Sequence, residues 1–257
     1  MNLLDTFENK YIIKGVIKTL SPIHIGTGQN DFSPISLDHA VIKDKDNKPF
    51  IPGTSLKGVL RSYMERLLKT GCFENYTSCL ITDTPCVDKN DVKKIKSNFK
   101  NIDDNTIKKI SVEIYKNQCD VCKMFGGKAF ASKIQINDCK LLNDNYKIEQ
   151  RDGVSISRDT LTGVKGRKYN FESVSSQTEF SFEMTIDNLE DKHKDLLKLI
   201  INVLKSGDLK VGGKTSAGLG AVQLIDEKVY LITKENLREY YMNGINDNNK
   251  EKMEVTL

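Results

Sequence analysis

The chain has 257 residues, of which 38% are hydrophobic, and this is enough for one elaborated domain with a packed core. The 39 basic and 35 acidic residues leave a net charge of +4, which excludes a strongly cationic protein but allows a local basic surface for a polyanion. No apolar run approaches the ~20 residues of a membrane span, and the first residues, MNLLDTFENK, lack the basic and apolar regions of a signal peptide. We therefore expect a cytoplasmic protein with no membrane partner.

The first half of the chain contains one predicted strand and one predicted helix. Residues 10–23 partly alternate apolar with polar residues and are rich in Ile, Tyr and Thr, which predicts a half-buried strand ended by Pro22. Farther on, apolar residues recur every three or four positions up to Gly71, and Thr54 and Ser55 are candidate N-caps, so this segment is predicted to be a helix.

The next segment, residues 72–127, follows neither period and is predicted to be an insertion, partly helical and mobile at its centre. After it, residues 131–142 and 179–186 alternate as strands, residues 191–205 have the apolar spacing of a second amphipathic helix, and residues 219–225 form a fourth predicted strand. The order strand, helix, strand, strand, helix, strand is that of a ferredoxin-like split βαβ fold in the α+β class.

A glycine-rich stretch precedes the last predicted strand. Residues 211–220, VGGKTSAGLG, contain four glycines, one lysine and two small hydroxyl side chains. Glycine has no Cβ and adopts positive φ, so such a loop can bring backbone N–H groups close to phosphates. The spacing fits neither a Walker A loop nor a Rossmann loop. We interpret it as a phosphate-binding loop, and the alternative is a tight turn between a helix and an edge strand.

The cysteines indicate a metal site. Cys119 and Cys122 form a C-x-x-C pair, a spacing that lets two thiolates bind one tetrahedral Zn²⁺. A second pair has to come from Cys72, Cys79 and Cys86, and we favour Cys79 and Cys86, across a polar insertion that a metal would stabilise. The alternatives are six free or buried thiols and, less favoured, a thioredoxin-like redox pair.

Two loop residues are candidates for contact with a phosphate or a cation. His24 stands next to Gly26 and Gly28, where an imidazole could contact a phosphate, although an ordinary surface histidine is the alternative. Asp38 lies in a loop flanked by apolar residues and away from acidic runs. A carboxylate there could hold a divalent cation or orient a 2′-hydroxyl against a phosphate.

In this order, six segments of the chain resemble the RAMP superfamily, and within it the backbone subunit of type III CRISPR effector complexes, which lines the guide RNA. The CDVCKMFGG and RDGVSISRDTLTG segments look closest to the zinc-containing members. The matching segments are HIGTG (24–28), LDHAV (37–41), PFIPGTSLKGVLRS (49–62), CDVCKMFGG (119–127), RDGVSISRDTLTG (151–163) and VGGKTSAGLG (211–220).

The resemblance implies an elaborated single domain with an RRM-like palm, a zinc-bearing lobe, a basic β-hairpin called the thumb and a C-terminal extension. Subunits of this kind stack along the CRISPR RNA (crRNA), and each thumb displaces one nucleotide of the duplex between guide and target. The expected boundaries are about 10–70, 128–150 and 175–227 for the palm, about 71–127 for the zinc-bearing insertion, about 151–174 for the thumb and 228–257 for the extension.

An RNA held in extended form needs repeated phosphate contacts, which a helix start and a glycine loop can supply. The alternative for the helix is that Lys57 and Arg61 form its solvated side. The resulting predicted RNA-binding residues are His24, Ser55, Lys57, Arg61, Arg158, Arg167, Lys168, Gly212, Gly213, Lys214 and Ser216.

For catalysis, the resemblance implies that an aspartate in the loop after the first strand cleaves target RNA beside each displaced nucleotide, with a divalent metal. Asp38 matches that position in its L-D-x-x-V context, and Asp31 and Asp44 are nearby competitors. The expected cofactors are structural Zn²⁺ and, for cleavage, Mg²⁺ or Mn²⁺. The expected partners are crRNA, complementary target RNA, further copies of this chain and other CRISPR effector subunits.

Three other functions are consistent with parts of the sequence. The first is a non-catalytic scaffold of the same kind. The second is a stand-alone endoribonuclease that processes repeat RNA, in which His24 or His39 would be the general base for attack by a 2′-hydroxyl. The third is an unrelated zinc protein that binds a nucleotide cofactor, which would leave the basic hairpin unexplained.

Overall fold

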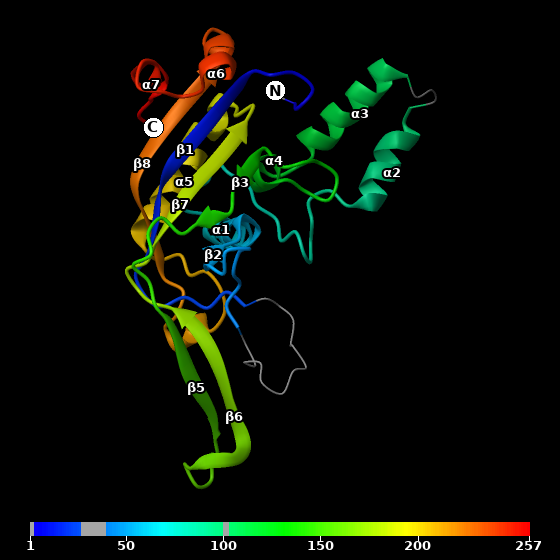
Figure 1. Cartoon of the computed structure of the whole chain (residues 1–257). Helices are drawn as coiled ribbons and strands as arrows, with labels where there is room; N and C mark the ends of the chain where they lie inside the picture. Colours follow the sequence, from blue (N-terminus) through cyan, green and yellow to red (C-terminus); the bar gives the residue numbers. More distant parts are fainter. Residues whose placement is uncertain (1–2, 27–39, 100–102) are drawn as a thin grey trace.

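The computed structural model describes residues 3–26, 40–99 and 103–257 of the chain (Figure 1). Its main sheet has four antiparallel strands in the spatial order β3-β7-β1-β8. The connections through the helices α1 and α5 make this the split βαβ arrangement, so the predicted ferredoxin-like α+β fold is confirmed. These elements are β1 (Asn9–Thr19), α1 (Gly53–Leu68), β3 (Ile134–Ile136), β7 (Glu179–Asp187), α5 (Lys194–Ser206) and β8 (Val222–Thr233).

The core lies between this sheet and the two helices. Strand β7 alternates strictly, so that Phe180, Phe182, Met184 and Ile186 face the helices. Burial of each such side chain contributes about 2 kcal/mol to the free energy of folding. Helix α5 begins after a short 3-10 turn, η1 (Asp191–His193), and ends at Gly207, whose φ of 79° is the usual C-terminal stop. The helix residues in the core are Leu56, Leu60, Met64 and Leu68 of α1 and Leu196, Leu197, Ile200, Ile201, Val203 and Leu204 of α5.

The opposite face of the sheet carries a row of ion pairs. Lys10, Lys14 and Lys18 of β1 stand directly opposite acidic residues of β7 in the strand register. Their Nζ atoms lie 3.3 to 3.9 Å from carboxylate oxygens. The end of this face nearest Ile12 is covered by the C-terminal segment, with helices α6 (Leu237–Asn243) and α7 (Lys250–Met253).

The insertion is partly helical, as predicted, and projects from the side of the sheet (Figure 1). It contains α2 (Lys89–Ser97), α3 (Asp104–Lys116) and α4 (Asp120–Phe125). A capping box at Asp88 starts α2, and the Asp103 side chain caps α3. Residues 100–102, at its centre, lie outside the described residues, so the expected mobility stays a prediction. The lobe has a small core of its own, formed by Val87, Ile95, Ile110 and Ile114.

A long β-hairpin extends from the end of the sheet that lies away from helices α6 and α7 (Figure 1). Its strands are β5 (Ile148–Ile156) and β6 (Gly163–Val174), which pair antiparallel. At the base, Val174 also forms a bridge with Ile23, which ties the hairpin to the end of the first strand segment. The hairpin strands span residues 148–174, and the role of a thumb expected at about 151–174 stays a prediction. Among the described residues, no helix is long and apolar enough to cross a bilayer.

The single strand predicted at residues 131–142 is wrong, because the chain forms two short strands there. Strand β3 joins the main sheet, whereas β4 (Cys139–Lys140) pairs with β2 (Phe50–Ile51). Between them the Asp138 carboxylate accepts a hydrogen bond from the backbone N–H of Gly53 at 2.8 Å. This long-range cap also corrects the predicted N-caps, since Thr54 and Ser55 lie inside α1.

The predicted end of the last strand at residue 225 is also wrong, since β8 continues to Thr233. Asp226 adopts a φ of 53°, and the pairing with β1 shifts register between Ile225 and Lys228. Such a bulge interrupts the alternation of apolar and polar residues. The alternating pattern therefore ends at residue 225 in the sequence, although the strand only changes register there.

Candidate functional site

The glycine-rich loop packs tightly against the chain at His24. The N–H of Gly213 donates to the His24 carbonyl oxygen at 2.8 Å. A Cβ built on Gly212, whose φ is 90°, would lie 2.2 Å from the same oxygen. Glycine is therefore required at position 212 by a backbone contact within the protein. The loop still exposes Gly212, Gly213 and Ser216, but the Gly213 N–H is bonded within the protein and gives the predicted phosphate contact of that residue no support.

His24 lies in the interior, which corrects the prediction of an imidazole open to a phosphate and also the alternative of an ordinary surface histidine. It is 7% exposed. Its Nδ1 lies 2.7 Å from the carbonyl oxygen of Glu172, and its ring meets the edge of Phe171 at a centroid distance of 5.6 Å. His24 thus joins the first strand segment to β6 at the base of the hairpin.

Lys214 connects the glycine loop to the hairpin. Its Nζ lies 4.3 Å from the centre of the Tyr169 ring and 4.5 Å from that of Phe171, both on β6. A cation above two aromatic faces is attracted by their negative quadrupoles. Tyr169 is 38% exposed, so one side of this basic and aromatic cluster remains open to solvent.

Helix α1 and the glycine loop enclose a groove of about 490 Å³. From α1 it is lined by Ser62, Tyr63 and Arg66, and the Arg66 guanidinium lies 5.1 Å from the centre of the Tyr63 ring. Asp208, Lys210 and Thr215 line the loop side, so one exposed carboxylate shares the groove with the cations. The sequence reasoning missed Tyr63, Arg66 and Lys210. The signal that could have found Arg66 is its spacing of four from Ser62 on the exposed stripe of α1.

Lys57 and Arg61 lie on a different stripe of α1, which the residues after the insertion cover. The Lys57 Nζ donates to the Ser132 hydroxyl at 2.7 Å and to the Ile134 carbonyl oxygen at 2.8 Å. Burial, assisted by the neighbouring Arg61, lowers the pKa of Lys57. Ser55 lies in the first turn, half-buried, with its N–H bonded to the Pro52 carbonyl oxygen. This geometry gives the predicted RNA contacts of Lys57 no support.

Arg61 joins α1 to the cysteine lobe. Its Nε donates to Glu65 at 2.7 Å, and its two terminal nitrogens donate to the Gly126 carbonyl oxygen at 2.6 Å and to the Cys122 Sγ at 3.2 Å. Glu65 is itself buried. Arg61 is therefore bound within the protein, and neither the predicted phosphate contact nor the alternative of a solvated helix side agrees with its surroundings.

The predicted basic residues of the hairpin, Arg158, Arg167 and Lys168, are all exposed. Lys168 pairs with Asp152 across the two strands at 2.9 Å. The hairpin end also exposes three apolar side chains, with Leu161 80% exposed. These basic and apolar groups are directed to solvent, where a nucleic acid could reach them.

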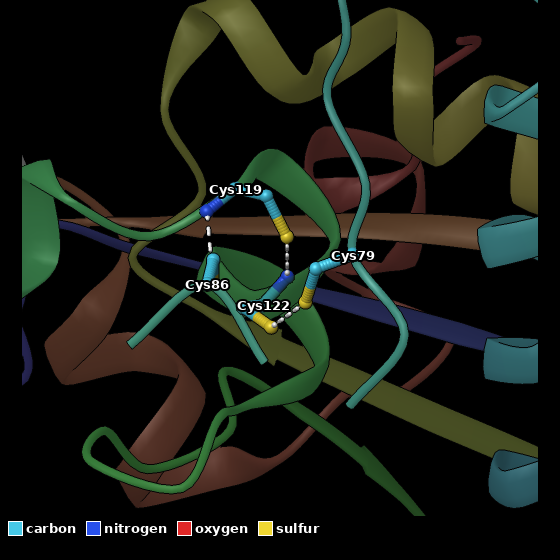
Figure 2. Close-up of side chains that lie close together, drawn as sticks. All are labelled: Cys79, Cys86, Cys119 and Cys122. Atoms are coloured by element: carbon cyan, nitrogen blue, oxygen red, sulfur yellow. Dashed lines mark hydrogen bonds between the residues drawn. The ribbon is translucent and has the colours of Figure 1, made fainter. Parts of the chain in front are cut away.

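The four cysteines that the spacing singled out come together (Figure 2). Their sulfur atoms all lie within 4.8 Å of one another, which is a geometry that can hold one metal ion. Cys119 and Cys122 come from the start of α4, whereas Cys79 and Cys86 come from the loop before α2. The third upstream candidate, Cys72, is exposed and outside the cluster.

Hydrogen bonds to the sulfur atoms of this cluster favour the anionic thiolate form. The N–H of Cys122 donates to the Cys119 Sγ at 3.4 Å, and the N–H of Cys119 donates to the Cys86 Sγ at 3.3 Å. Hydrogen bonds from the thiol and the backbone N–H of Cys122 lower the pKa of Cys119 to about 5. Burial raises the pKa of Cys79 to about 11. A bound cation would remove the remaining thiol protons.

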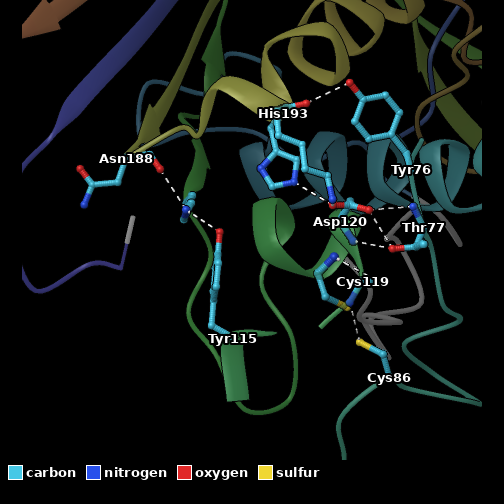
Figure 3. A network of polar contacts seen from close by, with 11 residues as sticks. Tyr76, Thr77, Cys86, Tyr115, Cys119, Asp120, Asn188 and His193 are labelled. Carbon is cyan, nitrogen blue, oxygen red and sulfur yellow. Dashed lines mark hydrogen bonds and ion pairs between the residues drawn. The ribbon is translucent and has the colours of Figure 1, made fainter. Parts of the chain in front are cut away.

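A buried carboxylate between the two C-x-x-C cysteines fixes the cluster to the palm (Figure 3). Asp120 accepts hydrogen bonds from the His193 Nε2 at 2.9 Å and from the Lys192 Nζ at 2.7 Å. It also accepts two from Thr77, through the backbone N–H and the hydroxyl, both at 2.8 Å. Burial acts to raise the pKa of Asp120, but these donors together hold it well below the ordinary value.

Lys133 is buried in the same region. Its Nζ donates to the Tyr115 hydroxyl at 2.8 Å and to the Asn188 carbonyl oxygen at 2.9 Å (Figure 3). Burial lowers the pKa of this ammonium to about 8. Lys133 thus joins α3 and the segment before η1 to the residues that lead into β3.

Asp38, Asp31 and His39 lie outside the described residues, but the ends of their segment are well defined. Gly26 and Val41 form an antiparallel bridge. The N–H of Val41 donates to a Glu172 carboxylate oxygen at 3.0 Å, and Lys43 pairs with the same carboxylate at 3.5 Å. Asp44 accepts hydrogen bonds from the N–H groups of residues 46 and 48, as in a turn. The segment therefore starts and ends beside the glycine loop and the hairpin base.

Comparison with known proteins gives a family match and two relatives. Residues 16–223 match the family model of the RAMP superfamily. A protein of Methanocaldococcus jannaschii named CRISPR system Cms endoribonuclease Csm3 is 26% identical over 261 residues, which cover 97% of this chain and 90% of that protein. A protein of the same name from Methanothermobacter thermautotrophicus is 37% identical over 60 residues, which cover 23% of this chain and 24% of that protein.

Proposed function

Since the chain belongs to the RAMP superfamily, we propose that it is a crRNA-binding backbone subunit of a type III CRISPR ribonucleoprotein that also cleaves complementary target RNA. The observation that carries this proposal is the similarity, over nearly the whole chain, to a protein named as a CRISPR endoribonuclease. The accessible basic and aromatic groups at one end of the palm support it. The proposed partners are crRNA, target RNA, further copies of this chain and other effector subunits.

The outer face of the sheet is a poor RNA surface. An RRM binds RNA by stacking bases on aromatic side chains of its sheet. Here the corresponding positions on β1 and β7 carry the cross-strand pairs of Lys10 with Asp187, Lys14 with Glu183 and Lys18 with Glu179. Each lysine is opposite a carboxylate, so this face offers little net positive charge, and the tyrosines at its edge, Tyr240 and Tyr241, come from helix α6 and not from the strands.

The groove between α1 and the glycine loop suits an RNA backbone better. Arg66 and Lys210 are exposed cations on its two sides, and the exposed Gly212 and Ser216 lie on the same loop. Tyr63 and Tyr169 offer rings for stacking at intervals along this end of the palm. We propose that the guide RNA runs here and continues past the exposed Arg158, Arg167 and Lys168 of the hairpin. This set replaces Lys57 and Arg61 by Arg66 and Lys210.

For target cleavage we propose Asp38, with Mg²⁺ or Mn²⁺ as the ion. A divalent ion beside a kinked RNA backbone stabilises the charge that develops on the scissile phosphate. Glu172, a carboxylate at the ends of the segment, contacts Val41 and Lys43 through one of its oxygens, and this engagement favours Asp38 over Glu172 as the residue that binds the ion. Asp44 is engaged in a turn, so Asp31 is the main competitor of Asp38.

For the cysteine cluster we propose Zn²⁺ in a structural role. Four thiolates bind Zn²⁺ tetrahedrally at about 2.3 Å each, which separates neighbouring sulfur atoms by about 3.8 Å. The cluster's sulfur atoms lie within 4.8 Å of one another, so small shifts would complete such a site. Because all four positions are taken by cysteines, the site would be closed, as structural zinc sites are.

The test of the proposed function is a cleavage assay with the assembled ribonucleoprotein and end-labelled target RNA. The wild-type complex should give regularly spaced fragments in Mg²⁺ or Mn²⁺ and none after chelation. Asp38→Ala should retain target binding and lose the fragments, whereas the matched variant Asp31→Ala should retain both. Fragments that persist in Asp38→Ala would show that this residue is not catalytic, and binding without any cleavage by the wild type would identify a scaffold.

An assay with a second substrate, repeat RNA, distinguishes the proposed function from that of a stand-alone processing enzyme. The chain alone would have to cut repeat RNA without metal, with a histidine as general base. The buried and hydrogen-bonded position of His24 argues against this function. His39 is the remaining loop candidate, so His39→Ala tested on repeat RNA completes the comparison.

A further inference from the structure

The two long helices of the insertion, α2 and α3, leave a groove of about 650 Å³ between them. This α2–α3 groove lies on the lobe that projects from the side of the sheet, away from the hairpin end of the palm (Figure 1). It shares no lining residue with the groove between α1 and the glycine loop. It therefore calls for a separate explanation.

The floor of the α2–α3 groove is aliphatic. On α3, Ile107, Ile110 and Ile114 follow one another at helical spacing, and Val92 of α2 and Ala129 complete the floor. Ile107 is 50% exposed although it lies within a helix. Ile110 and Ile114 are buried in the lobe's own core, so the solvent-accessible part of the floor consists of Ile107, Val92 and Ala129. An accessible aliphatic floor in a groove between two helices is typical of a site for another apolar surface.

The rim of the groove is basic. Lys89, Lys93, Lys96 and Lys128 line it and are all exposed. Within the described parts of the chain, none of the four forms an ion pair. The one acidic residue on the lining, Asp88, accepts hydrogen bonds from the N–H groups at the start of α2. The rim therefore presents an uncompensated positive charge around an aliphatic floor.

We propose that the α2–α3 groove is a docking site for an amphipathic helix of a partner protein, with an aliphatic stripe flanked by acidic residues. The stripe would cover Ile107, and the acidic flanks would pair with the lysine rim, so that charge complementarity selects the partner and its orientation. The inference does not depend on the proposed function, because it concerns a different surface and a different ligand.

Two other occupants fit the groove less well. RNA recognition uses aromatic stacking, and the lining of this groove contains no aromatic side chain. A second copy of the chain would bring Leu161, the most exposed large apolar side chain in the described part of the chain, together with Arg158 and Lys165 at the hairpin end. Those cations would meet the lysine rim and repel it. An acidic helix satisfies both the floor and the rim.

The test uses the full-length protein and a fluorescent probe, a designed helical peptide of about 18 residues with a leucine stripe and glutamate flanks, about 27 Å long at 1.5 Å per residue. A peptide with the same composition in scrambled order and one with lysine flanks are the probe controls. Anisotropy at moderate salt measures Kd. We expect binding of the glutamate peptide and at least tenfold weaker binding, about 1.4 kcal/mol or more, of both control peptides.

Matched variants locate the site. Ile107→Glu and the double variant Lys93→Glu, Lys96→Glu should weaken peptide binding at least about tenfold, because the former puts a charge on the floor and the latter inverts the rim. Lys94→Glu is the control, since this exposed lysine lies on the same helix but does not line the groove. The far-UV circular dichroism of each variant should match that of the wild type.

Four results would overturn the proposal. The first is equal binding of the glutamate and control peptides, and the second is an equal loss of peptide binding in the Lys94→Glu variant. The third is binding of single-stranded RNA that the double variant of Lys93 and Lys96 loses. The fourth is self-association of the wild type in sedimentation that the same double variant abolishes.

Discussion

The ammonium group of Lys214 lies 4.3 Å from the centre of the Tyr169 ring, although 45 positions separate the two residues in the sequence. Lys214 has a left-handed backbone with a φ of 58°. This unusual conformation directs the side chain from the glycine loop onto β6 at the hairpin base. The proposed guide-binding loop and the proposed thumb are thereby joined by a direct side-chain contact.

The groove between α1 and the glycine loop gives a prediction about RNA affinity. Arg66→Ala and Lys210→Ala should each weaken the binding of single-stranded RNA and reduce the slope of log K against log salt by about 0.7, because each removes one phosphate contact. The effect should be equal for unrelated guide sequences, since phosphates carry no sequence information. Filter binding at several salt concentrations measures it, and a loss confined to particular bases would contradict the proposed phosphate contacts.

The control for these variants is Lys69→Ala, an exposed lysine at the end of α1 that does not line the groove. Arg61→Ala is a second control, for which we expect a loss of stability that is separate from any loss of RNA binding. It would leave the buried Glu65 without its partner, so the free energy of unfolding should fall by about 3 kcal/mol. Urea denaturation distinguishes this loss of stability from a loss of RNA binding.

The cysteine cluster predicts about one zinc per chain by elemental analysis. Cys79→Ser and Cys119→Ser should lose the metal, and chelation should make the insertion sensitive to protease, because its apolar core is small. Cys72→Ser is the matched control, because this exposed cysteine lies outside the cluster. A purified protein that contains no metal but melts at the temperature of the zinc-loaded form would contradict the structural role.

Gly212 and Gly218 form a matched pair for the glycine loop. Both have a φ near 90°, but a Cβ on Gly212 would lie 2.2 Å from the His24 carbonyl oxygen, whereas a Cβ on Gly218 would meet nothing within 4 Å. Gly218→Ala should cost about 1 kcal/mol from backbone strain alone. Gly212→Ala should cost at least about 2 kcal/mol more from the clash. Thermal unfolding of both variants measures the difference, and equal losses would mean that the loop yields at His24.

Lys133 predicts a dependence of stability on pH. Its pKa in the folded protein, about 8, is below the ordinary value of 10.5, so between these values the unfolded chain binds a proton that the folded protein does not. The stability of the folded state should therefore rise as pH increases through this window and fall again as pH decreases toward 8.

The measurement compares the wild type with Lys133→Met by urea denaturation from pH 7 to 10. Relative to the variant, the wild type should gain about 2 kcal/mol over this range. The difference between the two proteins cancels the titration of other groups. A constant difference across the range would mean that Lys133 keeps an ordinary pKa in the folded protein.

Local patterns predicted much of the fold. The alternation of β7 and the three-to-four spacing in α1 and α5 were sufficient because each element buries one regular face. Ligand spacing predicted the C-x-x-C pair. These properties depend on neighbours within a few residues, whereas the approach of Cys79 and Cys86 to that pair is a long-range contact.

The failures arose from contacts between distant segments. Periodicity located the stripe of Lys57 and Arg61 but could not reveal that residues 126–134 cover it. The break at Asp138 depends on Gly53, and the continuation of β8 depends on a bulge opposite β1. For the same reason Arg66 was overlooked, since its groove exists only where the loop of Lys210 approaches α1.

Glu172 has a consequence for how the protein could measure distance along RNA. Its backbone carbonyl oxygen is bonded to His24, just before the segment 27–39, and its carboxylate is bonded to Val41, just after it. A single residue on the hairpin thus anchors both boundaries of the segment that contains Asp38. Any displacement of the hairpin base would carry those two boundaries with it, so the position of the hairpin along the RNA would set where the segment begins and ends.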